Sequence, residues 1–186
     1  MNSKAYWNVR LSRYNNYWRD ENYYPILDLF PCDEAFTLLD IGCALGDGCE
    51  LLHERFPKAR ITGIDISDVG ISKAQAKNSG VQYMVLNILK EEIPYMYDYI
   101  TIIETLEHFD DPFLIVNKCL THVRNALVIS VPYTPDKPSG PVPGVGEHRY
   151  LFNEKTFIDY NQGFLKVTDY IKATQSRCII YHLKPK

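Results

Sequence analysis

The sequence contains no run of lysine or arginine and no apolar stretch near the ~20 residues that a membrane-spanning helix requires. Its formal net charge is −3 and its isoelectric point is about 5.9, so a broad surface for nucleic-acid phosphates is not expected. The first residues lack the apolar core of a signal peptide. These absences favour a cytoplasmic protein without a membrane segment or a nucleic-acid partner, present as a monomer or a homodimer.

Cysteine is present, but not in a pattern that indicates a metal site or a disulfide framework. The five cysteines are odd in number and include no Cys-x-x-Cys pair, which suits reduced thiols packed inside a cytoplasmic protein. Repeats and low-complexity segments are absent as well. With 186 residues, of which 46% are hydrophobic, the chain has the size of one globular domain. We therefore expect residues 1–186 to form a single domain.

A glycine-rich turn follows the first apolar run of the chain. Residues 37–41 read as a buried strand, Gly42, Gly46 and Gly48 come next, and a helix is expected to begin near Asp47. A glycine turn between a strand and a helix lets the backbone approach a ligand closely and points a helix N-terminus at it. The spacing is not the Gly-x-Gly-x-x-Gly of nicotinamide-dependent dehydrogenases, which argues against that class.

Other predicted strands end in residues suited to ligand binding. Apolar runs predict six further strands, at 59–66, 81–86, 97–103, 125–131, 165–173 and 178–184. Three of the expected helices span 68–78, with Asp68 as its cap, 113–123 and 155–160. This alternation predicts an α/β fold with a parallel sheet covered on both faces. Ligands of such sheets lie beyond the carboxyl ends of the strands. Five residues fall there, namely Gly42, Asp65, Asn87, Glu104 and Pro132.

At the glycine turn the chain resembles the class I S-adenosylmethionine-dependent methyltransferases. Their pattern is an acid, then Gly-x-Gly-x-Gly after the first strand, then an acid that ends the second strand. Asp40, Gly42, Gly46 and Asp65 match it, while Ala44 replaces the middle glycine. The added methyl is tolerated if Ala44 has a negative φ. The resemblance implies a Rossmann-like, doubly wound seven-stranded sheet, mostly parallel, with an antiparallel strand in a C-terminal hairpin.

The same resemblance implies where S-adenosyl-L-methionine binds and where S-adenosyl-L-homocysteine forms. Asp65 would hold the ribose hydroxyls, and Asn87 would receive the adenine amino group on its side-chain oxygen, unless it is only a turn residue. Glu104 would border the cofactor. The expected cofactor-binding residues from this region are Asp40, Gly42, Cys43, Ala44, Gly46, Asp65, Ile66, Asn87, Ile88 and Glu104.

Residues 1–30 are rich in aromatic side chains and are expected to form a helical cap. Leu11, Tyr14 and Trp18 fall on one face of a helix. This face either packs onto the edge of the sheet or covers the cofactor cleft, with Tyr14, Tyr17 or Trp18 over the methionine end or the acceptor. Aromatic rings near a sulfonium would add cation–π attraction. Tyr14 and Tyr17 are therefore included among the expected cofactor contacts.

Side chains that bind metals or protons gather at residues 104–108. If the chain turns helical at Glu104, then Glu104, Glu107 and His108 share one face, and His148 is a fourth candidate ligand. The motif resembles that of ubiquinone-biosynthesis O-methyltransferases and small-RNA terminal ribose methyltransferases. In that subset of the family a divalent ion bridges the enzyme and adjacent hydroxyls of the substrate. Such an ion (Mn, Zn, Mg or Fe) would lower the pKa of a bound hydroxyl.

Two other roles stay open for this group of side chains. Without a metal, His108 or His148 would act as a general base, with Glu107 beside them in the catalytic group. Alternatively, Glu107 pairs with a nearby Lys or Arg and takes no part in chemistry. The stretch 133–149 is rich in Gly and Pro and follows a strand end, so we expect it to be a lid loop.

The sequence thus predicts an enzyme that transfers a methyl group from S-adenosylmethionine to a small-molecule acceptor. The first choice of acceptor is a hydroxyl of a sugar, catechol or quinol. N-methylation of an aminosugar or another small amine, with His108 or His148 as general base, is one alternative. A non-catalytic S-adenosylmethionine-binding module is the other.

Overall fold

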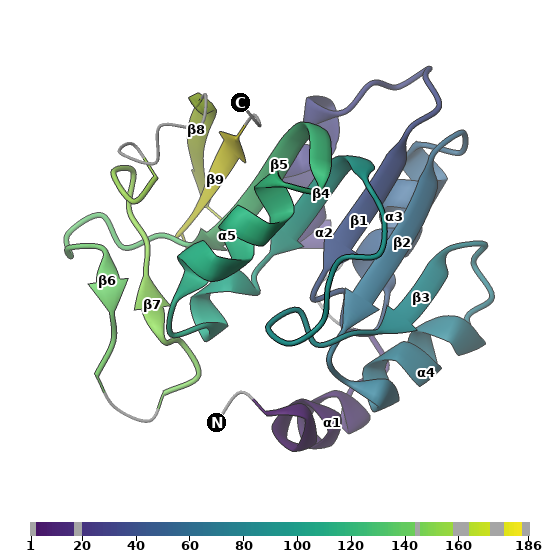
Figure 1. Ribbon diagram of the computed structural model, residues 1–186, viewed down its shortest axis with the longest axis horizontal. Helices are drawn as coiled ribbons and strands as arrows, with labels where there is room; N and C mark the ends of the chain where they lie inside the picture. Colours follow the sequence, from purple (N-terminus) through teal and green to yellow (C-terminus); the bar gives the residue numbers. More distant parts are fainter. Residues whose placement is uncertain (1–2, 17–19, 144–145, 158–163, 172–176, 184–186) are drawn as a thin grey trace.

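The computed structural model describes residues 3–16, 20–143, 146–157, 164–171 and 177–183. Within them the chain forms a seven-stranded sheet of order β3-β2-β1-β4-β5-β9-β8 (Figure 1). Its strands are β1 (Thr37–Ile41), β2 (Arg60–Asp65), β3 (Gln82–Val85), β4 (Tyr97–Ile103), β5 (Val123–Pro132), β8 (Phe164–Ile171) and β9 (Arg177–Leu183). Neighbouring strands are parallel except that β9 is antiparallel to both β5 and β8. This confirms the predicted fold.

Helices cover both faces of the sheet. They are α1 (Lys4–Ser12), α2 (Asp20–Tyr23), α3 (Asp47–Arg55), α4 (Asp68–Ala76) and α5 (Pro112–Leu120), with 3-10 turns η1 (Tyr24–Leu29) and η2 (Leu106–His108). One buried cluster joins the sheet to α5, and a second joins its other face to η1, α3 and α4. In Figure 1, α5 lies in front of the sheet, with α2 and α3 behind it.

Strand β1 shows how the two clusters form. Its side chains alternate between the faces of the sheet, so Leu39 and Ile41 enter the α5 cluster while Leu38 enters the α3 cluster. The strand is buried on both faces, as parallel strands usually are. The sheet order reverses between β1 and β4, and ligands of such folds bind at this reversal.

The chain does not turn helical at Glu104, which was the condition for Glu104, Glu107 and His108 to share one helix face. Glu104 takes a left-handed φ of +49°, and its N–H donates to the carbonyl oxygen of Ser130 at 2.8 Å. Only Leu106–His108 form a helical turn, of the 3-10 type. The backbone is held by neighbouring β5, so sheet pairing overrides the local helix propensity of the segment.

Other predicted boundaries need smaller corrections. Ser67 caps α4, not Asp68, because the Ser67 hydroxyl accepts the Gly70 N–H at 3.0 Å, and the helix ends at Ala76. α5 ends at Leu120 rather than 123 because Val123 already pairs with β4. Residues 154–157 form turns instead of the start of a helix over 155–160, and 158–160 lie outside the described residues.

All five cysteines are free thiols, and four of them are buried, as predicted. Among the residues that the structure describes, no helix is long and apolar enough to cross a membrane. The stretch 133–149 is not wholly irregular, because β6 (Gly140–Pro141) pairs with β7 (Tyr150–Leu151) in a small antiparallel sheet.

Gly48 in the first turn of α3 should not tolerate a side chain. A Cβ atom built there would lie 2.0 Å from the Tyr23 ring, and Tyr23 is only 6% exposed. We expect Gly48→Ala to lower the free energy of unfolding by about 1–3 kcal/mol, the usual cost of overpacking, measured by urea denaturation. Gly146→Ala is the matched control because only a backbone oxygen at 3.8 Å approaches its Cβ position. Equal stability of the two variants would contradict this packing.

Candidate active site

The turn after β1 is bonded to the end of β2. The N–H groups of Gly42 and Cys43 both donate to the carbonyl oxygen of Ile64, at 2.8 and 3.0 Å. The next N–H, of Ala44, donates to the Asp65 carboxylate at 3.0 Å. These three consecutive bonds fix the turn against β2, so the backbone of the turn and the Asp65 side chain are positioned together.

The φ angles of the turn explain its glycines. Gly42 and Gly46 have φ of +81° and +80°, in the left-handed region that favours glycine. Ala44 also lies there, with φ +50°, so the condition for tolerating its methyl without strain, a negative φ, is not met. The alanine adopts the conformation that the middle glycine of the pattern would adopt, at a cost of roughly 1–2 kcal/mol.

Asp65 ends β2 as a half-buried carboxylate. Besides the Ala44 N–H, it accepts the Ser67 N–H at 2.8 Å. Burial nevertheless raises its pKa to about 6, because removing water disfavours the charged form more than the backbone N–H donors favour it. A ligand that offers further hydroxyl donors would therefore stabilise the ionised carboxylate.

A cavity of about 660 Å³ opens at the carboxyl edge of the sheet, within the usual range for small-molecule and cofactor sites. Seven of the predicted cofactor residues line it, namely Gly42, Ala44, Asp65, Ile66, Asn87, Ile88 and Glu104. They follow the ends of β1, β2, β3 and β4, as expected for this fold. Because β3 is an edge strand and β4 lies past β1, Asn87 and Glu104 stand at opposite sides of the cavity.

Among the described residues, the other predicted cofactor residues, Asp40, Cys43, Gly46 and Tyr14, do not line the cavity. Tyr14 lies beyond the end of α1 and is 40% exposed, so its predicted place on the helix face is wrong. Cys43 is buried at 4% exposure, and Gly46 packs against Tyr83 and Ala74. Tyr17, like Trp18, lies outside the described residues.

Asp40 points away from the cavity, into the α3 side of the core. It is fully buried and accepts hydrogen bonds from the Tyr23 and Thr101 hydroxyls, both at 2.7 Å, and from the Cys49 thiol at 3.3 Å. Burial raises its pKa despite these donors. Asp40 thus has a structural role, because its hydrogen bonds join Tyr23 and β4 to β1.

Helix α1 lies across the mouth of the cavity and supplies Ser3, Lys4, Trp7 and Leu11 to its lining. Figure 1 shows it beside α4 at the end of the sheet. Lys73 of α4 donates to three carbonyl oxygens at the C-terminal end of α1. They belong to Leu11, Ser12 and Tyr14 and lie at 2.6–3.0 Å. A lysine placed there satisfies carbonyls that the helix leaves unpaired.

The sequence analysis missed Trp7. Its ring packs edge-on against His108 with centroids 4.9 Å apart. The spacing of Trp7 and Leu11 by one helical turn was the available signal. The prediction instead extended the face through Tyr14 to Trp18, whereas α1 ends at Ser12.

Glu104 and Asn87 each have a local structural role as well. The Ser130 hydroxyl contacts Glu104 at 3.4 Å, and the positive φ of Glu104 turns the chain at the end of β4. The Asn87 side-chain oxygen accepts the Leu89 N–H at 3.1 Å, which is the turn role considered above. That oxygen retains a second lone pair.

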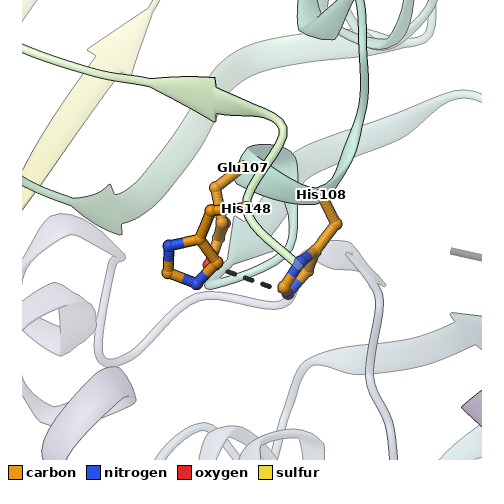
Figure 2. A group of neighbouring side chains, drawn as sticks. All are labelled: Glu107, His108 and His148. Carbon is orange, nitrogen blue, oxygen red and sulfur yellow. Dashed lines mark ion pairs between the residues drawn. The ribbon is translucent and has the colours of Figure 1, made fainter. Parts of the chain in front are cut away.

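Glu107, His108 and His148 converge, as Figure 2 shows. One ligand atom from each lies within 4.8 Å of those of the other two. Glu107 is 2% exposed, and its carboxylate lies 3.9 Å from Nε2 of His108. Glu104 is not part of this group, so the predicted four-residue set is reduced to three in the part of the chain that the structure describes.

The hydrogen bonds of His108 define its tautomer. Its Nδ1 lies 3.0 Å from the carbonyl oxygen of Glu147, and a carbonyl only accepts, so the proton is on Nδ1. Nε2 therefore presents a lone pair on the side of Glu107. Burial lowers the pKa of His108, which keeps the ring neutral. Such a nitrogen can accept a proton or bind a metal ion.

The comparisons with known proteins agree with this geometry. A family model described as "Methyltransferase domain" matches residues 39–126. The ubiquinone biosynthesis O-methyltransferase of Pseudomonas entomophila (strain L48) is 31% identical to this chain over a match that covers 59% of the chain and 54% of the relative. The chain spans about half the length of the curated relatives it matches.

Solved structures share the fold. The N-methyltransferase NodS from Bradyrhizobium japonicum WM9, in complex with S-adenosyl-L-homocysteine, has a TM-score of 0.70 at 18% identity, covering 97% of this chain and 99% of that chain. The [4+2]-cyclase SpnF has a TM-score of 0.75 at 13% identity, covering 98% and 95%. A protein described as a cyclase thus has this fold too, so the fold does not specify the reaction.

The sheet, with its glycine turn and terminal carboxylate at the strand-order reversal, defines a Rossmann-like domain with a nucleotide-type site. The family match and the curated relatives support a class I S-adenosylmethionine-dependent methyltransferase, and the solved structures share its fold.

Replacing Ala44 by the glycine of the family pattern should stabilise the protein. The substitution relieves the left-handed strain, which is worth roughly 1–2 kcal/mol, and loses about 0.4–1 kcal/mol through the greater freedom of glycine in the unfolded chain. We expect a net gain of about 0.5–1 kcal/mol in the free energy of unfolding, measured by urea denaturation. Ala76→Gly, at an exposed position in α4, should have the opposite sign. A loss of stability in Ala44→Gly would contradict the strain at this position.

Proposed function

We propose that this chain transfers a methyl group from S-adenosylmethionine to a hydroxyl of a small-molecule acceptor. The observation that carries the proposal is the neutral His108, with the lone pair of Nε2 beside Glu107, on the wall of the same cavity that Asp65 lines. A likeness to a relative named as an O-methyltransferase supports oxygen as the accepting atom.

The residues present fit the cofactor. The Gly42–Ala44 backbone has no long side chain toward the cavity. Hydroxyl donors from a ligand would lower the raised pKa of Asp65 by stabilising its ionised carboxylate. We infer that Asp65 holds the ribose hydroxyls and that Asn87 faces the adenine. Because Glu104 follows β4, at the other side of the cavity, we infer that it faces the methionine portion, where its negative charge suits an ammonium or a sulfonium.

S-adenosylmethionine supplies a methyl carbon on a positively charged sulfur and leaves as the neutral thioether S-adenosylhomocysteine. His108 Nε2 accepts the proton that the acceptor hydroxyl loses as its oxygen bonds to that carbon and the carbon–sulfur bond breaks. The chain's main contribution is to hold the two reactants aligned and about 3–3.5 Å apart. Trp7 and Leu11 of α1 line the cavity and restrict the entry of water.

A metal-assisted version of this reaction is the second candidate, favoured by the grouping of Glu107, His108 and His148. Their donor atoms suit a divalent transition metal or zinc, and the His108 Nδ1–H bound to a carbonyl is the usual outer support of a metal-binding histidine. The three ligand atoms lie within 4.8 Å of one another, and two ligands at 2.1 Å from one ion can be at most ~4.2 Å apart, so at most a small inward movement of these side chains is required. A bound ion would lower the pKa of an acceptor hydroxyl.

Cofactor affinity should fall in acid because of Asp65. Hydroxyl donors from the ribose favour the ionised carboxylate, so the pKa of Asp65 in the complex lies below its value of about 6 in the free protein. The affinity for the cofactor is therefore at its maximum well above pH 6. It decreases below pH 6, by up to about tenfold per pH unit. The measurement is calorimetric titration of S-adenosylhomocysteine between pH 5 and pH 8.

Asp65→Asn is the control for this pH dependence, because it keeps an oxygen for the Ala44 N–H but does not titrate. We expect it to bind more weakly at pH 8 and to lose the dependence near pH 6. An unchanged affinity at pH 8 would remove Asp65 from the ribose site. The absence of any binding by the unaltered protein would contradict the proposed function.

Metal binding is tested by titrating Mn²⁺ or Zn²⁺ into protein that has been treated with a chelator. The metal-assisted version predicts one ion per chain, lost in Glu107→Gln and in His148→Ala, because each removes one of three ligands. His53→Ala, on α3 away from the cluster, should bind as the unaltered protein does. S-adenosylhomocysteine binding without metal binding would leave His108 as a metal-free general base.

A further inference from the structure

Glu147 connects α1 to His108 through two different groups. Its side-chain carboxylate accepts the Tyr6 hydroxyl and the Arg10 guanidinium, the latter at 2.6 Å. Its backbone carbonyl oxygen accepts the Nδ1–H of His108 at 3.0 Å. One residue therefore bonds the helix that lies across the cavity and also fixes the tautomer of the proposed base.

The neighbouring backbone reinforces this connection. The Arg149 N–H donates to the carbonyl oxygen of Glu107 at 2.6 Å, and the Val142 N–H donates to the carbonyl oxygen of Arg149 at 2.8 Å. The Arg149 side chain also binds Asp110 at 2.6 Å. Residues 147–149 thus lie along the turn that bears Glu107 and His108. A displacement of Glu147 therefore moves its carbonyl oxygen, which accepts the hydrogen bond from Nδ1–H of His108.

Among the described residues, Trp7 of α1 packs against His108, and polar groups of α1 bond to two other parts of the chain, its anchors. One is α4, through Lys73, through the Ser67 hydroxyl on Asn8 at 2.6 Å, and through the exposed Lys4–Asp68 pair. The other is Glu147. The anchors stand on opposite sides of α1, and four residues of the helix segment line the cavity between them. Breaking the bonds from Tyr6 and Arg10 to Glu147 would free one side of α1, while its bonds to α4 would keep the helix attached.

We propose that Glu147 is a positioning residue that couples closure of α1 over the cofactor to the orientation of His108. The inference rests on the proposed function for its catalytic meaning. With the Tyr6 and Arg10 bonds made, the carbonyl of Glu147 holds the proton on Nδ1 and leaves Nε2 ready to accept. With those bonds broken, the segment 147–149 shifts, and His108 loses its single tautomer.

Two readouts test the coupling at one fixed pH of 8.5, where His108 is neutral. The first is the ¹⁵N spectrum of His108 without any ligand, assigned by comparison with His108→Gln, which reports the fraction of the Nδ1–H tautomer. The second is the dissociation rate of S-adenosylhomocysteine by stopped-flow tryptophan fluorescence. The groups charged or titratable around His108 are Glu107, His148, Glu147 and Arg10, so a fixed pH keeps their states constant.

The decisive variant is Tyr6→Phe combined with Arg10→Met, because it leaves Glu147 and His108 unaltered. We expect a mixture of His108 tautomers and a dissociation rate at least about tenfold higher, because the variant removes two charge-assisted hydrogen bonds to the Glu147 carboxylate. Glu147→Gln, which keeps the backbone carbonyl, should act in the same direction. The matched control for Glu147→Gln is Glu154→Gln, which removes the charge from the acceptor of a Tyr–Glu hydrogen bond of similar kind, from Tyr133 at 2.9 Å, at an exposed position that does not line the cavity.

Unchanged tautomers in the double variant would overturn the coupling, even if the ligand dissociates faster, because Glu147 would then only hold the helix. The same effect in Glu154→Gln would also overturn it. Circular dichroism establishes that each variant is folded. Failure of the unaltered protein to bind S-adenosylhomocysteine would contradict the proposed function, while the tautomer measurement, made without ligand, still decides the role of Glu147.

Discussion

The site depends on the three hydrogen bonds that join the turn after β1 to the end of β2. Gly42, Cys43 and Ala44 each donate an N–H to Ile64 or Asp65, and the turn that makes these bonds has a left-handed φ at positions 42 and 44. This constraint determines two properties at once. It places the backbone of Gly42–Ala44 on the cavity wall. It also holds the Asp65 carboxylate half-buried, where desolvation raises its pKa.

Beyond the turn, the cavity is assembled from segments far apart in the sequence. Hydrogen bonds to buried Asp40 hold Tyr23 and Thr101 against β1. On the other side of the turn, hydrogen bonds to Glu147 connect α1 to the η2 turn. Polar groups that are buried or half-buried are strong restraints when each has a partner. The reactive part of the site is therefore held by ordinary hydrogen bonds that take no part in the reaction.

The sequence was sufficient for the sheet and for the strand ends, because apolar runs and glycine turns depend on local chemistry. β4 was predicted at its observed bounds, the end of β1 was predicted at its observed residue, and the ends of β2 and β3 were predicted within one residue. The helical turn considered at Glu104 does not form, because the partner of its N–H, Ser130, belongs to another strand. Tyr14 was expected on the helix face, but α1 ends at Ser12, where Lys73 of α4 bonds the last carbonyl oxygens, a contact between distant segments. The left-handed Ala44 likewise follows from tertiary bonds.

The distance between α1 and its anchors has a consequence for how the chain folds. A helix of nine residues is marginal alone in water, since isolated helices need about 12–15 residues. Its bond to Glu147 spans 137 residues of sequence, and its bonds to Lys73 span about 60. During synthesis α1 therefore leaves the ribosome 137 residues before the partner of Arg10 does. This helix, which lines the cavity, becomes ordered only after the sheet beneath it exists.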